Sequence, residues 1–258
     1  VTRDSFNWRT RLAVPWYGVA ALLFFVAALY PIMATQGKSQ FRMPGAENTP
    51  LTLDGLDYLQ YAQHWEGGLQ PGNFLDMADE YNAIRWLQDN VEGSPTIMEG
   101  LSTTVLYRWG GRISVNTGLP AVVGWDFHQR QQRSLRLMGD RIGMRVANVN
   151  AFYSTTDVNI AAELLRYYEV EYVVFTHFER QIYTIYDEVT GDLIDDSALQ
   201  KFPQMVEMGL LEVVHTDAND VPMIYEVNQA ALYDLLRQRV TAEGDAVADN
   251  SLTDGLAE

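Results

Sequence analysis

The longest pattern along the chain is an uncharged apolar run near its N-terminus. Residues 12–34 contain no Asp, Glu, Lys or Arg. At about 1.5 Å per residue a helix over this run spans about 34 Å, more than the roughly 30 Å hydrocarbon core of a bilayer. Trp16, Tyr17 and Tyr30 lie near its two ends, where aromatic rings favour the membrane interface. The pattern predicts one transmembrane helix over 12–35.

The flanks of this run predict its orientation. Three arginines precede it, whereas only Lys38 and Arg42 follow closely. Because cytoplasmic flanks carry an excess of Lys and Arg, we expect 1–11 in the cytoplasm and the rest of the chain on the extracytoplasmic side of the plasma membrane. A cleaved signal peptide is the alternative, although its apolar core is usually shorter, about 7–15 residues. Since the chain starts at Val1 and enters the membrane within a dozen residues, we expect it to be the C-terminal part of a larger polytopic protein.

Helix-like and strand-like patterns alternate along residues 36–240. Apolar residues three or four positions apart give one face of a helix over 77–91. The run 171–178 is typical of a buried strand, and the two strands around the DANDVP turn favour an antiparallel hairpin. We therefore expect one α/β domain, three-layer-like, with a small mixed sheet. The predicted helices are 77–91, 127–141, 158–170 and 229–240, and the predicted strands are 95–100, 112–115, 121–123, 171–178, 210–217 and 222–227.

Two signals mark element ends. Thr156 or Asp157 is placed to cap the helix over 158–170. The last residues, 241–258, hold five acidic side chains and no basic or aromatic ones. Segments of this composition bury too little apolar surface to fold, so we expect a disordered tail.

Charge and composition exclude several classes of function. The chain has 34 acidic and 18 basic residues, a net charge of −16, and only two lysines. Nucleic-acid binding needs clustered Lys and Arg, so no nucleic-acid partner is expected. The chain has no cysteine, which rules out disulfides, thiolate metal sites and a cysteine nucleophile. Its four histidines lack metal-site spacing and the common nucleotide and hydrolase motifs are missing, so we expect no metal or other cofactor and recognise no catalytic motif.

The most informative polar segment is 99–133, where charged, aromatic and glycine residues mix as they do in loop-built sites. Two of its arginines, Arg112 and Arg133, are suited to hold a phosphate or carboxylate, and His128 to carry a proton. Further candidates follow the strand at 171–176, a favoured position for ligands in open α/β sheets. The candidate ligand-binding residues are Glu99, Tyr107, Arg112, Thr117, Trp125, His128, Arg133, Glu179 and Arg180. The alternative remains that the arginines pair internally with Asp and Glu while the glycines serve turns.

The segment 111–133, GRISVNTGLPAVVGWDFHQRQQR, carries a family resemblance. It resembles the C-terminal region of an uncharacterised family of polytopic membrane proteins from Chloroflexi and archaea that has a YYY signature. Further matches are DEYNAIRWLQDNVEGSPTIMEG at 79–100 and VEYVVFTHFERQIY at 170–183, in the same order. The matched positions in the first segment are Arg112, Ile113, Ser114, Thr117, Gly118, Leu119, Pro120, Gly124, Trp125, His128 and Arg133.

That family is similar in architecture to GT-C glycosyltransferases, which transfer a sugar from a polyprenyl-phosphate carrier at the outer membrane face. The resemblance implies that this chain is the extracytoplasmic C-terminal domain of such a protein, with the catalytic part outside this chain. The implied partners are the lipid bilayer and a lipid-phosphate sugar or glycan acceptor. A non-enzymatic membrane-tethered binding or assembly domain is the alternative.

Overall fold

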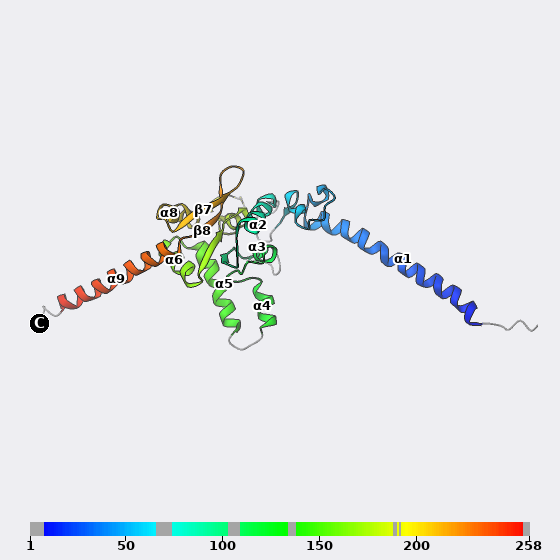
Figure 1. The fold of residues 1–258 in the computed structure, drawn as a ribbon, viewed down its shortest axis with the longest axis horizontal. Helices are drawn as coiled ribbons and strands as arrows, with labels where there is room; N and C mark the ends of the chain where they lie inside the picture. Colours follow the sequence, from blue (N-terminus) through cyan, green and yellow to red (C-terminus); the bar gives the residue numbers. More distant parts are fainter. Residues whose placement is uncertain are drawn as a thin grey trace, which may run out of the picture. The chain divides into compact units, whose positions relative to one another are not determined.

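The computed structural model describes residues 8–65, 74–102, 109–133, 138–187, 190 and 192–254 (Figure 1). The chain divides into two compact units, Val1–His64 and Trp65–Glu258. Residues 36–64 thus group with the N-terminal helix, whereas the sequence predicted that the α/β domain begins at 36. Among the candidate site residues, Tyr107 lies outside the described residues.

The first unit is dominated by helix α1 (Trp8–Arg42). Within it, Ala13–Thr35 is long and apolar enough to cross a membrane, and its apolar window is uncovered by the rest of the chain. The apolar helix predicted at 12–35 is therefore present. It continues past Pro31 to Arg42. The short elements that follow in this unit are η1 (Ala46–Asn48), η2 (Asp57–Gln60) and β1 (Gln63–His64).

The second unit is built on a four-stranded sheet with the order β3-β4-β8-β7. Its strands are β3 (Thr96–Met98), β4 (Val170–Val174), β7 (Leu211–Thr216) and β8 (Pro222–Val227). The β3 and β4 strands are parallel, whereas β8 runs antiparallel to both β4 and β7. This confirms an α/β fold with a small mixed sheet, and it confirms the hairpin predicted around the DANDVP turn.

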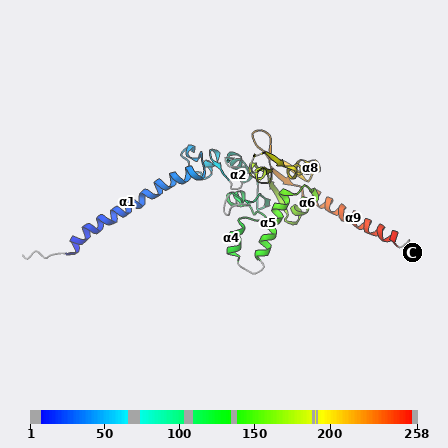
Figure 2. The ribbon, with the colours of Figure 1, turned by 180° about the vertical axis from the view of Figure 1, so that it is seen from behind.

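Helices cover both faces of this sheet, which gives three layers (Figures 1 and 2). On one face the Trp86 ring of α2 lies 6.4 Å from the Tyr172 ring and 5.7 Å from the His215 ring, measured between centroids. The next residue of β4, Val173, points to the opposite face and packs in the main hydrophobic core with residues of α5, α6 and α8. The helices of this unit are α2 (Ala78–Asn90), α3 (Arg112–Thr117), α4 (Asp126–Gln132), α5 (Met138–Ser154), α6 (Val158–Tyr167), α7 (His177–Ile182), α8 (Lys201–Glu207) and α9 (Gln229–Asp254). Its short elements are β2 (Leu75–Asp76), β5 (Ile185–Tyr186), β6 (Leu193–Asp195) and η3 (Ser197–Gln200).

Two helices begin where side-chain oxygens satisfy free backbone N–H groups. At α6 the Asp157 carboxylate accepts a hydrogen bond from Asn159 N over 2.8 Å, which confirms the cap predicted there. At α7 Thr176 and Glu179 form a capping box. Each cap satisfies donors that the helix itself leaves unpaired.

Several predicted elements differ from the structure. The strand predicted over 171–178 ends at Val174, and α7 begins at His177. The segment 112–115, predicted as a strand, belongs to α3, because Gly111 turns the chain at φ 82° and a helix follows. The second extended piece, 121–123, contributes only an isolated parallel bridge between Ala121 and Ile97. The single helix predicted over 127–141 is divided into α4 and α5, which lie side by side (Figure 2).

The C-terminal segment also differs from its prediction. Composition predicts a disordered tail over 241–258, whereas α9 extends as far as Asp254. This stretch of α9 has no proline to interrupt it, although Gly244 and its Asp, Asn, Ser and Thr residues have low helix propensity.

Candidate functional site

The two parallel strands end at the same edge of the sheet. The chain leaves β3 through Glu99 and Gly100, and it leaves β4 through Phe175 and Thr176. In open α/β sheets, ligands bind outside the carboxyl ends of the strands. This edge of the sheet is therefore a candidate position for a ligand-binding site.

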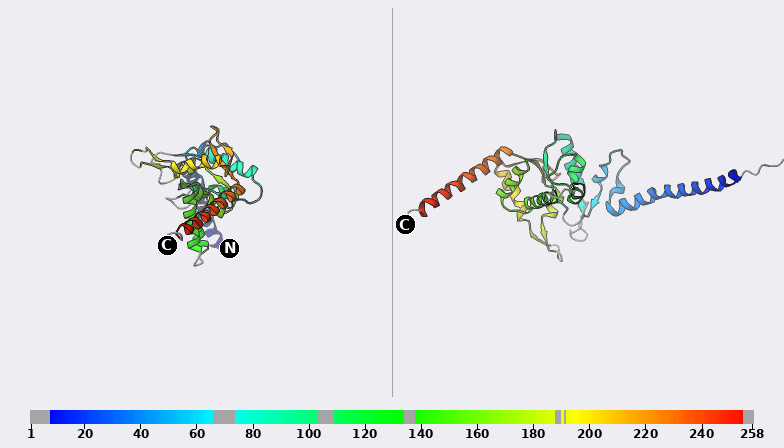
Figure 3. Two further views of the ribbon diagram at one scale, coloured as in Figure 1. Left: turned by 90° about the vertical axis from the view of Figure 1, so that its left-hand side faces the viewer. Right: turned by 90° about the horizontal axis from the view of Figure 1, so that it is seen from below.

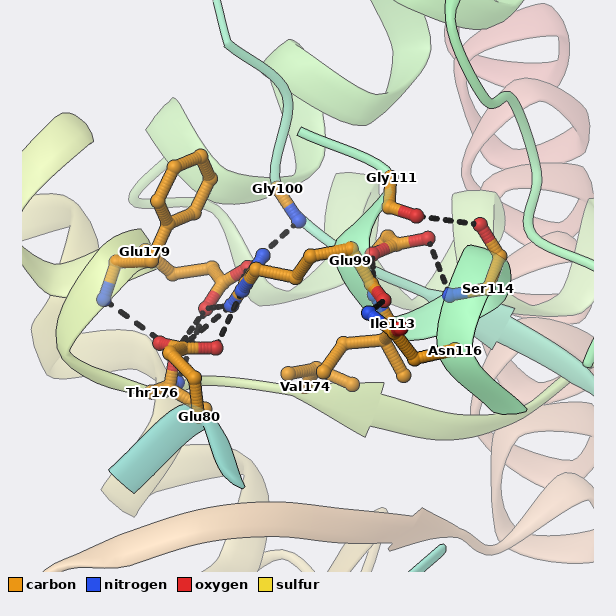
Figure 4. A network of polar contacts seen from close by, with 12 residues as sticks. Glu80, Glu99, Gly100, Gly111, Ile113, Ser114, Asn116, Val174, Thr176 and Glu179 are labelled. Atoms are coloured by element: carbon orange, nitrogen blue, oxygen red, sulfur yellow. Dashed lines mark hydrogen bonds and ion pairs between the residues drawn. The ribbon is translucent and has the colours of Figure 1, made fainter. Parts of the chain in front are cut away.

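A buried polar cluster occupies this edge (Figure 4). We call it the Arg112 cluster, and its members come from α2, α3, α7 and the ends of β3 and β4. Each member exposes no more than 3% of its surface. The members are Glu80, Glu99, Arg112, Thr176 and Glu179.

Arg112 stands at the centre of the cluster. Its Nε forms an ion pair with Glu80, and its Nη2 donates to Glu179 Oε2 over 2.8 Å and to Thr176 Oγ1 over 2.8 Å. The guanidinium carbon lies 4.2 Å from the centre of the Phe178 ring, a cation–π contact. Arg112 is therefore held by internal contacts, as the alternative interpretation of the sequence described.

Glu179 ties the two strand ends together. Its Oε1 accepts from Gly100 N over 2.8 Å, and its Oε2 accepts from Thr176 N over 3.0 Å (Figure 4). A Cβ on residue 100 would lie 2.9 Å from the Glu179 side chain, so the close approach requires glycine there. Thr176 in turn donates its hydroxyl to Glu80. One carboxylate thus bridges β3, β4 and α7.

Glu99 holds the start of α3. Gly111 precedes this helix and has no side chain to cap it. The Glu99 carboxylate accepts instead from Ile113 N over 2.9 Å and from Ser114 N over 3.1 Å (Figure 4). A residue at the end of β3 thereby supplies the cap that places Arg112 inside the fold.

The cluster contains three carboxyl groups for one guanidinium. Burial raises the pKa of Glu80, and the nearby Glu179 carboxylate raises it further while Arg112 opposes both effects. Burial also raises the pKa of Glu99. Burial acts to lower the pKa of Arg112, but Glu179 and Glu80 outweigh this effect and raise it above its ordinary value. Arg112 therefore remains charged, and burial favours the neutral form of Glu80 and Glu99.

The other candidate residues lie away from the cluster's interior. His128 is exposed on α4, where it contacts Gln132 at 2.7 Å between nitrogens, and Arg133 is exposed directly after the helix. Trp125 donates from Nε1 to Gly110 O over 2.6 Å. Thr117 closes α3 by donating to Ile113 O. The structure thus brings Glu99, Arg112 and Glu179 together, but not the residues of α4.

Arg180 is adjacent to Glu179 but serves a different contact. Its Nη2 donates to Pro222 O over 2.7 Å, and its guanidinium carbon lies 4.1 Å from the centre of the Phe175 ring. Burial lowers the pKa of this side chain. Arg180 therefore fastens α7 to β8.

Two members of the cluster were not singled out from the sequence. Glu80 lies on the buried face of α2 with Ala83, Ile84 and Leu87, which are three, four and seven positions further on. That helical spacing would have marked it as a buried acid. Thr176 and Glu179 match the T-x-x-E capping-box pattern, which is also visible in the sequence.

A second buried cation lies at Lys201. Its Nζ donates to Tyr153 O over 3.0 Å and to Ala198 O over 2.9 Å, and it lies 4.8 Å from the centre of the Phe202 ring. Burial lowers the pKa of Lys201 to about 7. In the part of the chain that the structure describes, no carboxylate lies within ion-pair distance of it.

The fold and the cluster define a mixed α/β domain preceded by an apolar helix. Comparison of the chain with protein-family models, curated proteins and solved structures gives no match. Over the described ranges, no group of three or more His, Cys, Asp or Glu side chains is arranged to hold a metal ion.

Proposed function

We propose that this chain is a membrane-tethered, extracytoplasmic domain whose role is binding or assembly. One observation carries the choice of binding over chemistry at the sheet edge. The position that an α/β sheet offers to a ligand is filled by the chain's own Arg112, which contacts Glu80, Glu179 and Thr176. The apolar helix Ala13–Thr35 supports the tether.

A role within a GT-C-like glycosyltransferase is the second candidate. The segments that carry the family resemblance, 79–100, 111–133 and 170–183, contain all members of the Arg112 cluster. In a protein of this kind the Arg112 cluster would stabilise the domain and would not contact the substrate. The exposed residues His128 and Arg133 are then the ones available to a lipid-phosphate sugar or a glycan acceptor.

Binding of a polyprenyl phosphate separates the two candidates. The chain is reconstituted in lipid nanodiscs, and the affinity for the lipid phosphate is measured for the natural sequence and for Arg133→Ala. The matched control is Arg239→Ala, because Arg239 is also exposed and pairs with Glu163 on the surface. We expect equal affinities for all three proteins, because an assembly domain does not use Arg133 to bind a lipid phosphate.

A loss of affinity in Arg133→Ala alone would have a different meaning. A loss of about tenfold or more confined to Arg133→Ala, equivalent to about 1.4 kcal/mol, would favour the glycosyltransferase setting and overturn the assembly role. An equal loss in both variants would instead indicate a general effect of positive charge on lipid-phosphate binding.

A further inference from the structure

A two-stranded ribbon projects from the second unit. It consists of β5 and β6, which are antiparallel and pair Ile185 with Asp195 and Tyr186 with Leu193. The ribbon lies between α7 and η3 in the sequence and is separate from the four-stranded sheet. It projects from the body of the second unit (Figure 3). Over the described residues it has only two strands, so both of its outer edges offer backbone groups for pairing.

The aliphatic side chains of this ribbon are largely exposed. Ile185 is 55% exposed, Leu193 57% and Ile194 61%. The pairing register shifts at Ile194, so this residue has no partner directly opposite it on β5. Leu193 and Ile194 are consecutive, and the body of the domain covers neither of them. An isolated two-stranded ribbon is marginally stable in water, and a third strand added at one edge would stabilise it.

The charge around these side chains selects the partner. Residues 185–187 and 192–196 contain four acidic side chains and no Lys or Arg. A second copy would place like charges against each other, and an anionic lipid surface would repel the ribbon in the same way. In a strand that alternates basic and aliphatic residues, the basic side chains would pair with the carboxylates and the aliphatic ones would cover the exposed apolar side chains.

We propose that the β5–β6 ribbon is a docking site for a basic, extended polypeptide segment of a partner protein, which adds to the ribbon as a third strand. Main-chain hydrogen bonds along a free edge supply the pairing, and the aliphatic side chains of the segment cover Leu193 and Ile194. This inference rests on the proposed assembly role and names the chemistry of its partner.

The test uses the full chain in nanodiscs and a labelled ten-residue peptide in which Lys and Val alternate. A block peptide of the same composition, five Lys followed by five Val, is the control for charge alone. The variant is Leu193→Ser with Ile194→Ser. Its matched control is Val115→Ser, because Val115 is 63% exposed on α3. Fluorescence anisotropy gives each affinity, and circular dichroism checks that the variants remain folded.

We expect the alternating peptide to bind the natural chain about tenfold or more tightly than the block peptide does. The double variant should lose about tenfold or more of this affinity, since two aliphatic contacts are removed, whereas Val115→Ser should lose none. Charge reversal at the exposed Asp192, by Asp192→Lys, should weaken binding of the Lys–Val peptide and strengthen binding of a Glu–Val peptide.

Equal binding of the alternating and block peptides would overturn the proposal, because the net charge of −16 would then explain it. Unchanged binding by the double variant would also overturn it. Self-association that is lost in the double variant would identify a second copy of the chain as the partner and overturn the proposal. Binding to phosphatidylglycerol vesicles that is lost in the same variant would overturn it in favour of a membrane surface. The lipid-phosphate measurement with Arg133→Ala is independent of these results, so failure of the ribbon and failure of the assembly role are distinguishable.

Discussion

At the scale of single residues, Arg112 determines how the sheet edge is organised. It is the only cation that the described structure places within the Arg112 cluster, and it faces Glu80 and Glu179 at ion-pair distance. Breaking a buried ion pair from one side is costly because the partner charges stay desolvated. The stability of the domain should therefore depend strongly on this one guanidinium.

We predict that Arg112→Ala lowers the free energy of unfolding by about 3–5 kcal/mol. In a unit of this size the thermal midpoint should fall by about 10 °C, which differential scanning fluorimetry or circular dichroism measures. The control is Arg130→Ala. Arg130 is about 41% exposed and lies 3.7 Å from Asp126, so its removal should change the midpoint little.

The pH dependence of this variant provides a second check. Without Arg112, only the hydrogen bond from Thr176 opposes the effect of burial, which already raises the pKa of Glu80. A carboxyl group whose folded pKa is raised destabilises the fold as pH rises through that pKa, and the penalty disappears below the unfolded value of about 4.3. The deficit of Arg112→Ala relative to the natural sequence should shrink from pH 8 to pH 5. A deficit that stays constant with pH would argue against uncompensated carboxylates as its cause.

At the scale of elements, the ends of helices explain most of the polar contacts. Glu99 caps α3 from a neighbouring strand, the capping box of Thr176 and Glu179 starts α7, and Asp157 starts α6. Lys201, at the beginning of α8, acts at the other end of a helix: its Nζ donates a hydrogen bond to Tyr153 O near the carboxyl end of α5. Each contact satisfies a backbone group that a helix leaves free.

The Lys201 contact predicts a specific dependence of stability on pH. Its pKa is about 7 in the folded protein, against about 10.4 in an unfolded chain. Between these values the unfolded chain binds more protons, so the free energy of unfolding rises with pH. The urea midpoint should therefore increase from pH 7 to pH 9, and this increase should vanish in Lys201→Met.

The chain provides a control for this measurement. Lys38 is its only other lysine, so Lys38→Met should retain the increase seen in the natural sequence. Burial also raises the pKa of Tyr153, but an unfolded tyrosine titrates only near pH 10, above the measured interval. An increase that persists in Lys201→Met would mean that another group titrates between pH 7 and pH 9.

At the scale of the whole molecule, the proposed orientation of the chain across the membrane can be measured directly. The helix Ala13–Thr35 has the length to span a bilayer, and the arginines before it favour a cytoplasmic N-terminus. Because the chain has no cysteine, a single introduced thiol reports its location without interference.

We predict that Ala218→Cys, in the exposed turn between β7 and β8, reacts with a membrane-impermeant maleimide on intact cells. Ser5→Cys, ahead of the apolar helix, should react only after the cells are lysed. Labelling of both positions in the soluble fraction would point to a cleaved or unanchored chain. Labelling of Ser5→Cys alone on intact cells would reverse the orientation.

Local patterns in the sequence were sufficient for the main elements. The uncharged run predicted an apolar helix, periodicity predicted α2 and α6, and turn chemistry predicted the β7–β8 hairpin. These features depend on residues a few positions apart, so their spacing is visible in the sequence before the fold is known. The same locality explains the error at 112–115, since the cap that starts α3 comes from Glu99 on another element.

Only the tertiary structure decided which polar side chains are buried and which stay on the surface. The sequence placed Arg112 and Arg133 in one candidate site, whereas the fold buries the first against Glu80 and leaves the second exposed. Thr176 and Glu80, whose side chains meet in the cluster, are 96 positions apart in the chain. Burial of a charge is stable only when distant segments bring its partners, so the apolar helix was determined by the sequence alone, and the identity of the Arg112 cluster by the fold.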